Sequence, residues 1–125
     1  MNLRLLSDKE GSCLEKMPTQ SFTTPQDERW TELMPGVSLL SLAEPVPGGS
    51  IHRARLVKGT VIPAHTHPAS EYVHVVSGTI ETGGRRCTPG TFWVTPGNVR
   101  QGPHIALDDV ELLTIRLGPM GVFEG

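Results

Sequence analysis

Two histidines and a glutamate stand close together in the middle of the chain, in the run His65-Thr-His67-Pro-Ala-Ser-Glu71. Side chains alternate between the two faces of a β-strand, so His65 and His67 point to one face if this segment is extended. Glu71 lies an even number of positions further on, past a bend at Pro68, and a sheet can bring its carboxylate to that face. Two imidazoles and one carboxylate on one face suit a divalent transition metal ion.

A fourth candidate ligand, His104, lies well beyond this group. It follows an expected strand over Thr91–Thr95 and a loop that begins at Pro96. In an antiparallel barrel we expect that strand to lie beside the segment of His65, which would carry His104 toward the same site.

The elements that must position these side chains are short strands. With 14 Gly and 11 Pro scattered over 125 residues, turns are frequent and long helices have little room. We expect about eight or nine strands in an antiparallel sandwich or barrel. The candidate strands cover residues 30–36, 37–42, 51–57, 61–67, 71–77, 79–82, 85–87, 91–95 and 110–117, and the tail over 118–125 is expected to be a loop.

Composition argues against several classes of protein. The net charge of −2 and the scattered basic residues do not suit a nucleic-acid surface, which is normally clearly basic. No apolar run approaches the ~20 residues of a membrane span, and the start, Met1–Glu10, lacks the apolar core of a signal peptide. We therefore expect a cytoplasmic protein without nucleic-acid or membrane partners, in which Cys13 and Cys87 are free thiols.

The central segment resembles the first motif of the cupin superfamily, G-x5-H-x-H-x3,4-E-x6-G. Gly59, His65, His67, Glu71 and Gly78 fit this motif at every spacing. The resemblance implies an all-β fold, the jelly-roll barrel or double-stranded β-helix of the cupins, with one divalent transition metal inside. The two glycines are expected to supply turn conformations that other residues rarely adopt.

The second cupin motif, G-x5-P-x-G-x2-H-x3-N, is matched in part. Gly90 and Pro96 occupy its first two positions, whereas Asn98 stands at the second glycine and Gln101 stands where histidine is expected. We interpret the difference as a three-residue loop insertion that still delivers His104. The metal ligands that the resemblance implies are then His65, His67, Glu71 and His104.

The resemblance covers roughly residues 33–117. It divides the chain into an N-terminal arm over residues 1–28, partly ordered or pairing in a dimer, and a cupin barrel over residues 29–125. Small cupins often dimerise through N-terminal strands, so we expect a homodimer. The opening from Trp30 to Gly36 looks like cupin domains related to zinc-binding anti-sigma factors and to small-ring dioxygenases. Such anti-sigma factors carry an additional helical domain, for which this chain leaves no room, so that function is not expected.

Strand alternation also assigns side chains outside the ligand set. His52 lies on one face of its strand, and Arg53 and Arg55 lie on the other. Arginines inside the barrel would favour an anionic substrate, but we expect them on the solvent face. Because Phe92 and Trp93 are adjacent, one of the two should reach the interior.

On the strand that begins with Glu71, His74 and Tyr72 have the opposite parity. If Glu71 faces the metal, His74 faces away from it, where a dimer interface could cover it, and is not a ligand. Tyr72 is for the same reason a poor candidate for a catalytic base.

A divalent ion bound to three neutral histidines and one carboxylate has a net charge near +1 and keeps positions for water or a ligand. We expect an oxygenase of the iron-dependent type that acts on a small oxygenated organic compound, such as a β-dicarbonyl or a phenolic ketone. The alternatives are a non-oxidative metal-dependent lyase or isomerase, and a sensor that binds metal and small-molecule ligand without turnover. The ligand set does not choose among Fe, Mn, Ni and Zn.

Overall fold

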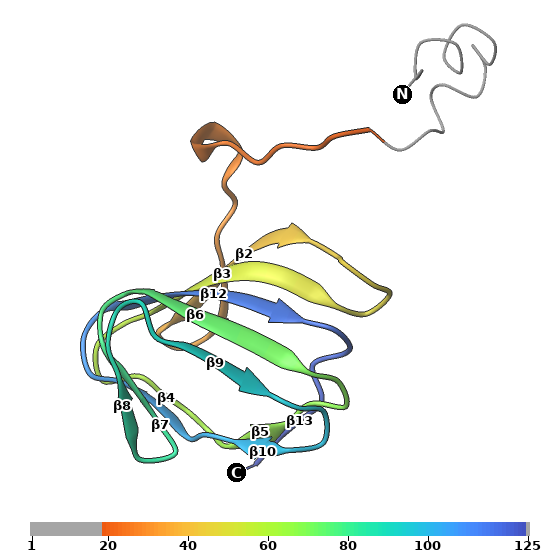
Figure 1. Ribbon diagram of the computed structural model, residues 1–125. Coiled ribbons are helices and arrows are strands. Elements are labelled where there is room, and N and C mark those ends of the chain that lie inside the picture. Colours follow the sequence, from red (N-terminus) through yellow and green to blue (C-terminus); the bar gives the residue numbers. More distant parts are fainter. Residues whose placement is uncertain (1–18, 125) are drawn as a thin grey trace, which may run out of the picture.

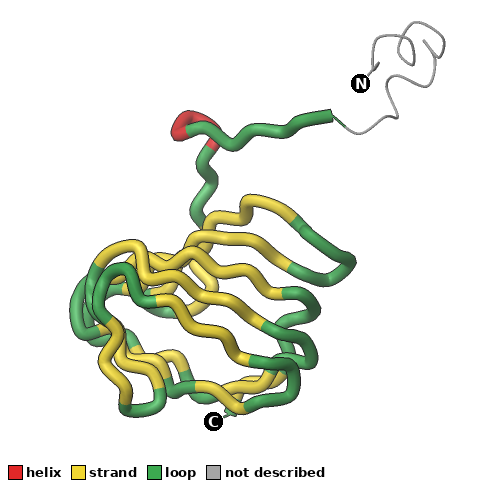
Figure 2. The backbone as a smooth tube through the Cα atoms, viewed as in Figure 1, coloured by secondary structure: helices red, strands yellow, loops and turns green. Residues whose placement is uncertain are grey.

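The computed structural model describes residues 19–124 of the protein. Its strands form three antiparallel sheets that curl around a common interior (Figure 1), and strand dominates the smooth trace of the backbone (Figure 2). A short 3-10 helix, η2 (Pro25–Asp27), precedes the first strand. The expected all-β jelly-roll barrel is confirmed.

The largest sheet has six strands in the order β1-β2-β3-β12-β6-β9. Its central strand β12 comes from near the end of the chain and pairs with β3 on one side and β6 on the other. The strands of this sheet are β1 (Thr31–Met34), β2 (Val37–Ala43), β3 (Ser50–Leu56), β6 (Glu71–Ser77), β9 (Phe92–Thr95) and β12 (Val110–Arg116).

Two smaller sheets complete the barrel and lie below the large sheet in Figure 1. One has the order β4-β11-β7-β8, with β4 (Val61–Ile62), β7 (Ile80–Thr82), β8 (Arg85–Cys87) and β11 (His104–Ala106). The other has the order β10-β5-β13, with β5 (His65–Thr66), β10 (Arg100–Gln101) and β13 (Val122–Phe123).

The expected strands are present, but the tail differs from the expectation. Val122 pairs with Thr66 and Phe123 pairs with His65, so part of the expected loop is strand β13. The extended segment over residues 61–67 is divided between β4 and β5, with Pro63 between them. A strand of two residues displays no alternation, which is why periodicity in the sequence did not reveal β13.

The interior of the barrel follows from strand alternation. On β12 every second side chain is buried, namely Val110, Leu112, Thr114 and Arg116. Val110 and Leu112 join an apolar core in which Leu56, Ile80, Val37 and Val75 are the largest fully buried side chains. Burial of each such side chain stabilises the fold by about 1.5–3 kcal/mol relative to exposure. The interior is apolar at the Val110 end of β12 and polar at the Arg116 end.

The arginines of β3 lie on the outer face of the large sheet, as expected. Arg53 forms ion pairs with Glu111 at 2.8 Å and Glu28 at 2.9 Å. Arg55 bonds to the other oxygen of Glu111 at 3.1 Å, and its guanidinium lies 4.0 Å from the ring centroid of Trp30. These contacts hold the chain just before β1 against the barrel.

The predicted N-terminal arm is only partly within the described residues, since residues 1–18 lie outside them. Within residues 19–124, no helix is long and apolar enough to cross a membrane. The division at residues 28 and 29 and the homodimer stay predictions.

Gly78, which ends β6, provides a test of how tightly the barrel closes. Its φ of +75° is in the left-handed region, and a Cβ added there would overlap the carbonyl oxygen of Asp109. Gly84 has a similar φ of +84° but open space around it. We expect Gly84→Ala to destabilise by about 1–2 kcal/mol through backbone strain alone. Gly78→Ala should lower the free energy of unfolding by about 1–3 kcal/mol more than Gly84→Ala does, because its Cβ would overlap Asp109. Urea unfolding of the two variants measures both effects, and equal losses would show that the Asp109 contact is not limiting.

Candidate metal centre

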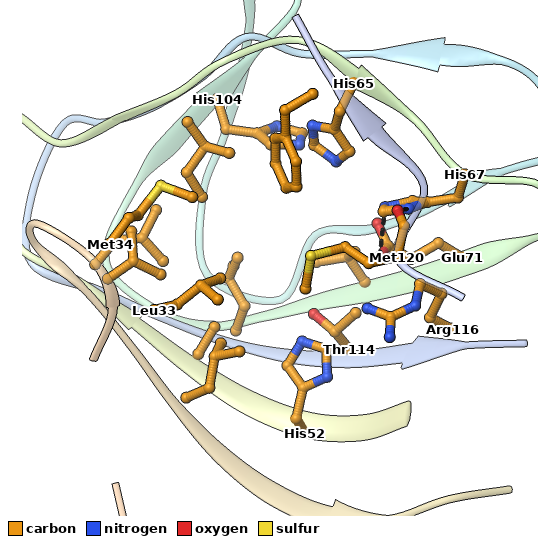
Figure 3. Close-up of a pocket in the computed structure, with 18 of the residues that line it drawn as sticks. Leu33, Met34, His52, His65, His67, Glu71, His104, Thr114, Arg116 and Met120 are labelled. Atoms are coloured by element: carbon orange, nitrogen blue, oxygen red, sulfur yellow. Dashed lines mark hydrogen bonds and ion pairs between the residues drawn. The ribbon is translucent and has the colours of Figure 1, made fainter. Parts of the chain in front are cut away.

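The structure brings three of the four predicted ligands together inside the barrel. His65 begins β5, His67 follows that strand directly, and Glu71 begins β6. All three side chains are buried, and one candidate ligand atom from each lies within 4.8 Å of the others. Figure 3 shows His67 and Glu71 side by side at one end of the cavity and His65 above it. Thr66, between the histidines, is only half-buried, so the predicted alternation is present.

Backbone carbonyls fix the tautomers of both histidines. Nδ1 of His65 lies 2.9 Å from the carbonyl oxygen of Pro63, and Nδ1 of His67 bonds to the carbonyl oxygen of Met120. A carbonyl oxygen only accepts, so in each ring Nδ1 carries the proton and donates it. In the neutral form of each ring, Nε2 then carries the lone pair, as is usual for histidines that bind a metal.

The contact between His67 and Glu71 indicates that a cation belongs here. Nε2 of His67 lies 3.1 Å from Oε2 of Glu71. With the proton on Nδ1, that contact sets a lone pair against a carboxylate oxygen, which is repulsive unless a proton or metal ion lies between them. Three buried polar atoms at the site also have no hydrogen-bond partner among the described residues: His67 Nε2, Gln101 Oε1 and His104 Nδ1. The donor set fits a divalent transition metal.

Glu71 is held in its charged form despite its burial. Burial raises the pKa of this carboxyl, but a proton on His67 Nε2, between the two groups when no metal ion is bound, and a hydrogen bond from Gln101 outweigh that effect and lower the pKa below its ordinary value. Nε2 of Gln101 donates to Oε1 of Glu71 at 3.0 Å. Glu71 is therefore a carboxylate at neutral pH, as a metal ligand must be.

His104, the predicted fourth ligand, lies beside the cluster and is also buried. Its ring centroid is 5.2 Å from that of His65, and its ring stacks on Trp93 at 5.9 Å. It is not part of the group of ligand atoms within 4.8 Å of one another. Burial lowers the pKa of His104 to about 4, and burial likewise lowers the pKa of His65, so both rings are neutral at physiological pH.

The loop before His104 differs from the expectation. The strand over residues 92–95 pairs with β6 and not with β5, whose neighbours are β10 and β13. Gln101 of β10 lies opposite His65, in the barrel wall. Asn98 has a φ of +65°, a conformation that asparagine tolerates and that glycine would adopt at this position of the motif. The turn therefore needs no insertion, and Gln101 stands beside the cluster where the motif has histidine.

Gln101 is a site residue that the ligand assignment from sequence passed over. Its place in the second motif, at the position of the histidine, could have identified it. The preference for a histidine as the ligand favoured His104 instead.

The C-terminal segment covers one side of the site. Besides the carbonyl of Met120, the ring of Phe123 lies 4.8 Å from that of His65. The amide of Glu124 donates to the carbonyl of Ala64 at 2.8 Å. Residues 120–124 therefore position His65, His67 and the residue just before β5.

The cluster opens into a cavity of about 90 Å³ whose walls are mostly apolar. Trp93 lines this cavity while Phe92 is exposed, so the interior member of that pair is the tryptophan. His52, Thr114 and Arg116 form a polar wall (Figure 3). Burial, and then repulsion from Arg116, lower the pKa of His52. Sequence reasoning left His52 undecided and did not single out Arg116. As expected, His74 lies on the outer face of β6 and is exposed.

An antiparallel jelly-roll barrel with a His-His-Glu cluster on its inner wall defines a cupin. The family model of the ChrR cupin-like domain matches residues 18–121. The chain belongs to this family. No curated protein matches the sequence.

Solved structures with this fold are numerous. The structure of KdgF from Halomonas sp. has a TM-score of 0.67 at 25% identity and covers 82% of this chain and 97% of that one. An acetylacetone dioxygenase from Acinetobacter johnsonii has a TM-score of 0.72 at 13% identity, covering 85% and 79%. The anti-sigma factor ChrR in complex with SigE, from Rhodobacter sphaeroides, has a TM-score of 0.65 at 16% identity, covering 90% and 77%.

The buried histidines predict how stability depends on pH when no metal is bound. The pKa of His104 is about 4 in the folded protein, against 6.5 for an ordinary histidine. Between these values the unfolded chain takes up a proton that the folded protein does not, so the free energy of unfolding falls as pH falls from 6.5 toward 4. At about 1.4 kcal/mol for each pH unit, His104 alone should lower the free energy of unfolding by about 3 kcal/mol over this pH range.

Urea unfolding of chelator-treated protein at several pH values measures this dependence. His104→Gln should flatten it, while His74→Gln, on the exposed face, should leave it unchanged. Stability that is constant across this window would contradict the buried neutral state of His104.

Proposed function

We propose that the protein is a metal-dependent cupin oxygenase that acts on a small oxygenated organic compound. The observation that carries the proposal is the buried His65-His67-Glu71 cluster, whose three side chains line a mostly apolar cavity. His104 is proposed as the fourth ligand because its ring is neutral, buried and beside His65, with Nδ1 unpartnered among the described residues. Imidazole nitrogen is a better ligand for these metals than a neutral amide oxygen.

The residues around the cluster have separate tasks in this proposal. The carbonyls of Pro63 and Met120 orient the two imidazoles, and Gln101 orients the carboxylate of Glu71. When bound, a divalent ion supplies Lewis acidity and, in the case of iron, the one-electron chemistry that reactions with dioxygen need. The apolar walls exclude water from the reacting groups, which strengthens electrostatic interactions within the site.

The size of the cavity limits the substrate. A volume of about 90 Å³ has room for on the order of six or seven water-sized groups. A compact β-dicarbonyl is of this size, and the structural likeness to an acetylacetone dioxygenase at 13% identity supports the fold needed for such a reaction.

A second candidate function is a sensor that binds metal and a small ligand without turnover. The observation that favours it is membership of the ChrR cupin-like family, together with the likeness to the anti-sigma factor ChrR in its complex with SigE. In that case the same cluster would hold the ion, and the occupied cavity would change a surface that a partner protein contacts.

Metal analysis of protein purified without added metal tests the site. We expect about one transition metal ion per chain, and we expect the His65→Ala/His67→Ala double variant to lose it. His74→Ala is the matched control, because His74 lies on the outer face of the same barrel. A wild-type protein that resists loading with Fe, Mn, Ni and Zn would sink both candidate functions.

Metal titration of single variants tests the fourth ligand. His104→Ala should weaken binding by about ten-fold or more, and Gln101→Ala should weaken it less because that residue only orients Glu71. A larger loss for Gln101→Ala would assign the fourth position to its amide oxygen.

Oxygen uptake by the Fe(II)-loaded protein separates the two candidate functions. With a panel of β-dicarbonyls and catechols, we expect at least one compound to be consumed together with dioxygen, and the double variant to be inactive. Compounds that raise the melting temperature without any oxygen uptake would favour the sensor over the oxygenase.

A further inference from the structure

Arg116 is a buried arginine on the inner wall of the cavity. It is the last residue of β12, its side chain is 9% exposed, and it faces inward with Val110, Leu112 and Thr114. Its Nε donates to the carbonyl oxygen of Gly118 at 2.7 Å, which fixes the plane of the guanidinium. In Figure 3 the guanidinium points toward Thr114 and His52, on the side of the cavity next to Glu71.

This arginine has no counter-ion among the described residues. Arg53, Arg55 and Arg100 each form an ion pair with a glutamate, but no carboxylate oxygen of residues 19–124 pairs with Arg116. A buried charge without a partner is strongly unfavourable, so such a group is expected to bind an anion. The two terminal nitrogens of a guanidinium are spaced to bind both oxygens of a carboxylate.

Two further polar side chains lie beside it on the same face. Thr114 and His52 are direct partners across β12 and β3, and both are buried. His52 is held by a 2.8 Å contact between its Nδ1 and the hydroxyl of Ser50, which is itself the cross-strand partner of Arg116. Apart from the His65-His67-Glu71 cluster and His104, the remaining residues that line the cavity are apolar.

The charges inside the cavity also favour an anion. Among the described residues that line it, Glu71 and Arg116 alone are charged when the histidines are neutral. Their charges cancel, so a bound divalent ion leaves the cavity with an excess of two positive charges in a region that excludes water. An anionic ligand would reduce this excess, whereas a neutral ligand would not.

We propose that Arg116, together with Thr114 and His52, binds the carboxylate of a small organic acid whose other end reaches the His65-His67-Glu71 cluster. The inference rests on the proposed function in that it names the class of compound that occupies the same cavity. It makes Arg116 a specificity-determining residue that selects a keto acid or similar anion over a neutral dicarbonyl.

Calorimetric titration with matched probes tests this proposal without requiring turnover. Acetoacetate and acetylacetone have similar size and shape, but only acetoacetate carries a carboxylate, and acetate serves as the smallest carboxylate probe. Each is titrated into zinc-loaded and chelator-treated protein. We expect Arg116→Gln to weaken acetoacetate binding by about ten- to hundred-fold and to leave acetylacetone binding unchanged. Arg55→Gln, on the outer face, is the control.

Arg116→Gln also loses the bond to Gly118, so a second variant guards against misfolding. Thr114→Val keeps the shape of the side chain and should weaken acetoacetate binding several-fold with no effect on acetylacetone. Equal losses for the two ligands, or no binding of acetate or acetoacetate in either state of the protein, would overturn the proposal.

The outcomes also separate this proposal from the proposed function. Binding of acetoacetate that depends on Arg116 in a protein that takes up no metal would support the anion site and reject the oxygenase. Uptake of metal and binding of acetylacetone, without binding of the two carboxylates, would reject the anion site alone.

Discussion

The pairing of β12 between β3 and β6 is the constraint on which the rest of the structure depends. Because side chains alternate along a strand, this register decides which residues of three strands face the interior. It places Leu112 between Ala54 and Val75 in the core, and Arg116 between Ser50 and Glu71 at the site. A slip by one residue would bury Glu111 and expose Arg116. One pairing therefore stabilises the barrel and positions the charged groups of the cavity.

Backbone carbonyl groups orient the histidines of the metal cluster. Each imidazole is oriented by a backbone carbonyl group, one just before β5 and one in the C-terminal segment. These carbonyls hold the imidazoles so that a divalent cation could bind their Nε2 atoms and the Glu71 carboxylate together, with little reorganisation of the side chains.

Much of the barrel could be predicted from the sequence because alternation and glycine-proline turns are local signals. Parity put Glu71 and His74 on opposite faces, and the resemblance to the first cupin motif indicated that Glu71 is the one that faces inward. The interior position of Arg116 could not be predicted in this way. An arginine at the end of an apolar strand is expected to be exposed until the neighbouring strands are known. Gln101 shows the opposite difficulty. Its place in the second motif was visible, but because it is not a histidine, the segment before His104 was interpreted as an inserted loop. Strand β13 is too short to have a pattern, and its pairing is a tertiary contact.

The closure of the site by residues 120–124 has a consequence for how such a protein could diversify. Met120 contributes a backbone carbonyl to His67, and Phe123 contributes a ring contact and a strand pairing to His65. Substitutions in this short tail would tilt the imidazoles while every ligand stayed in place. Metal preference and reactivity could then drift among related chains whose ligand residues are identical, with the tail acting as a tuning element remote from the ligands in sequence.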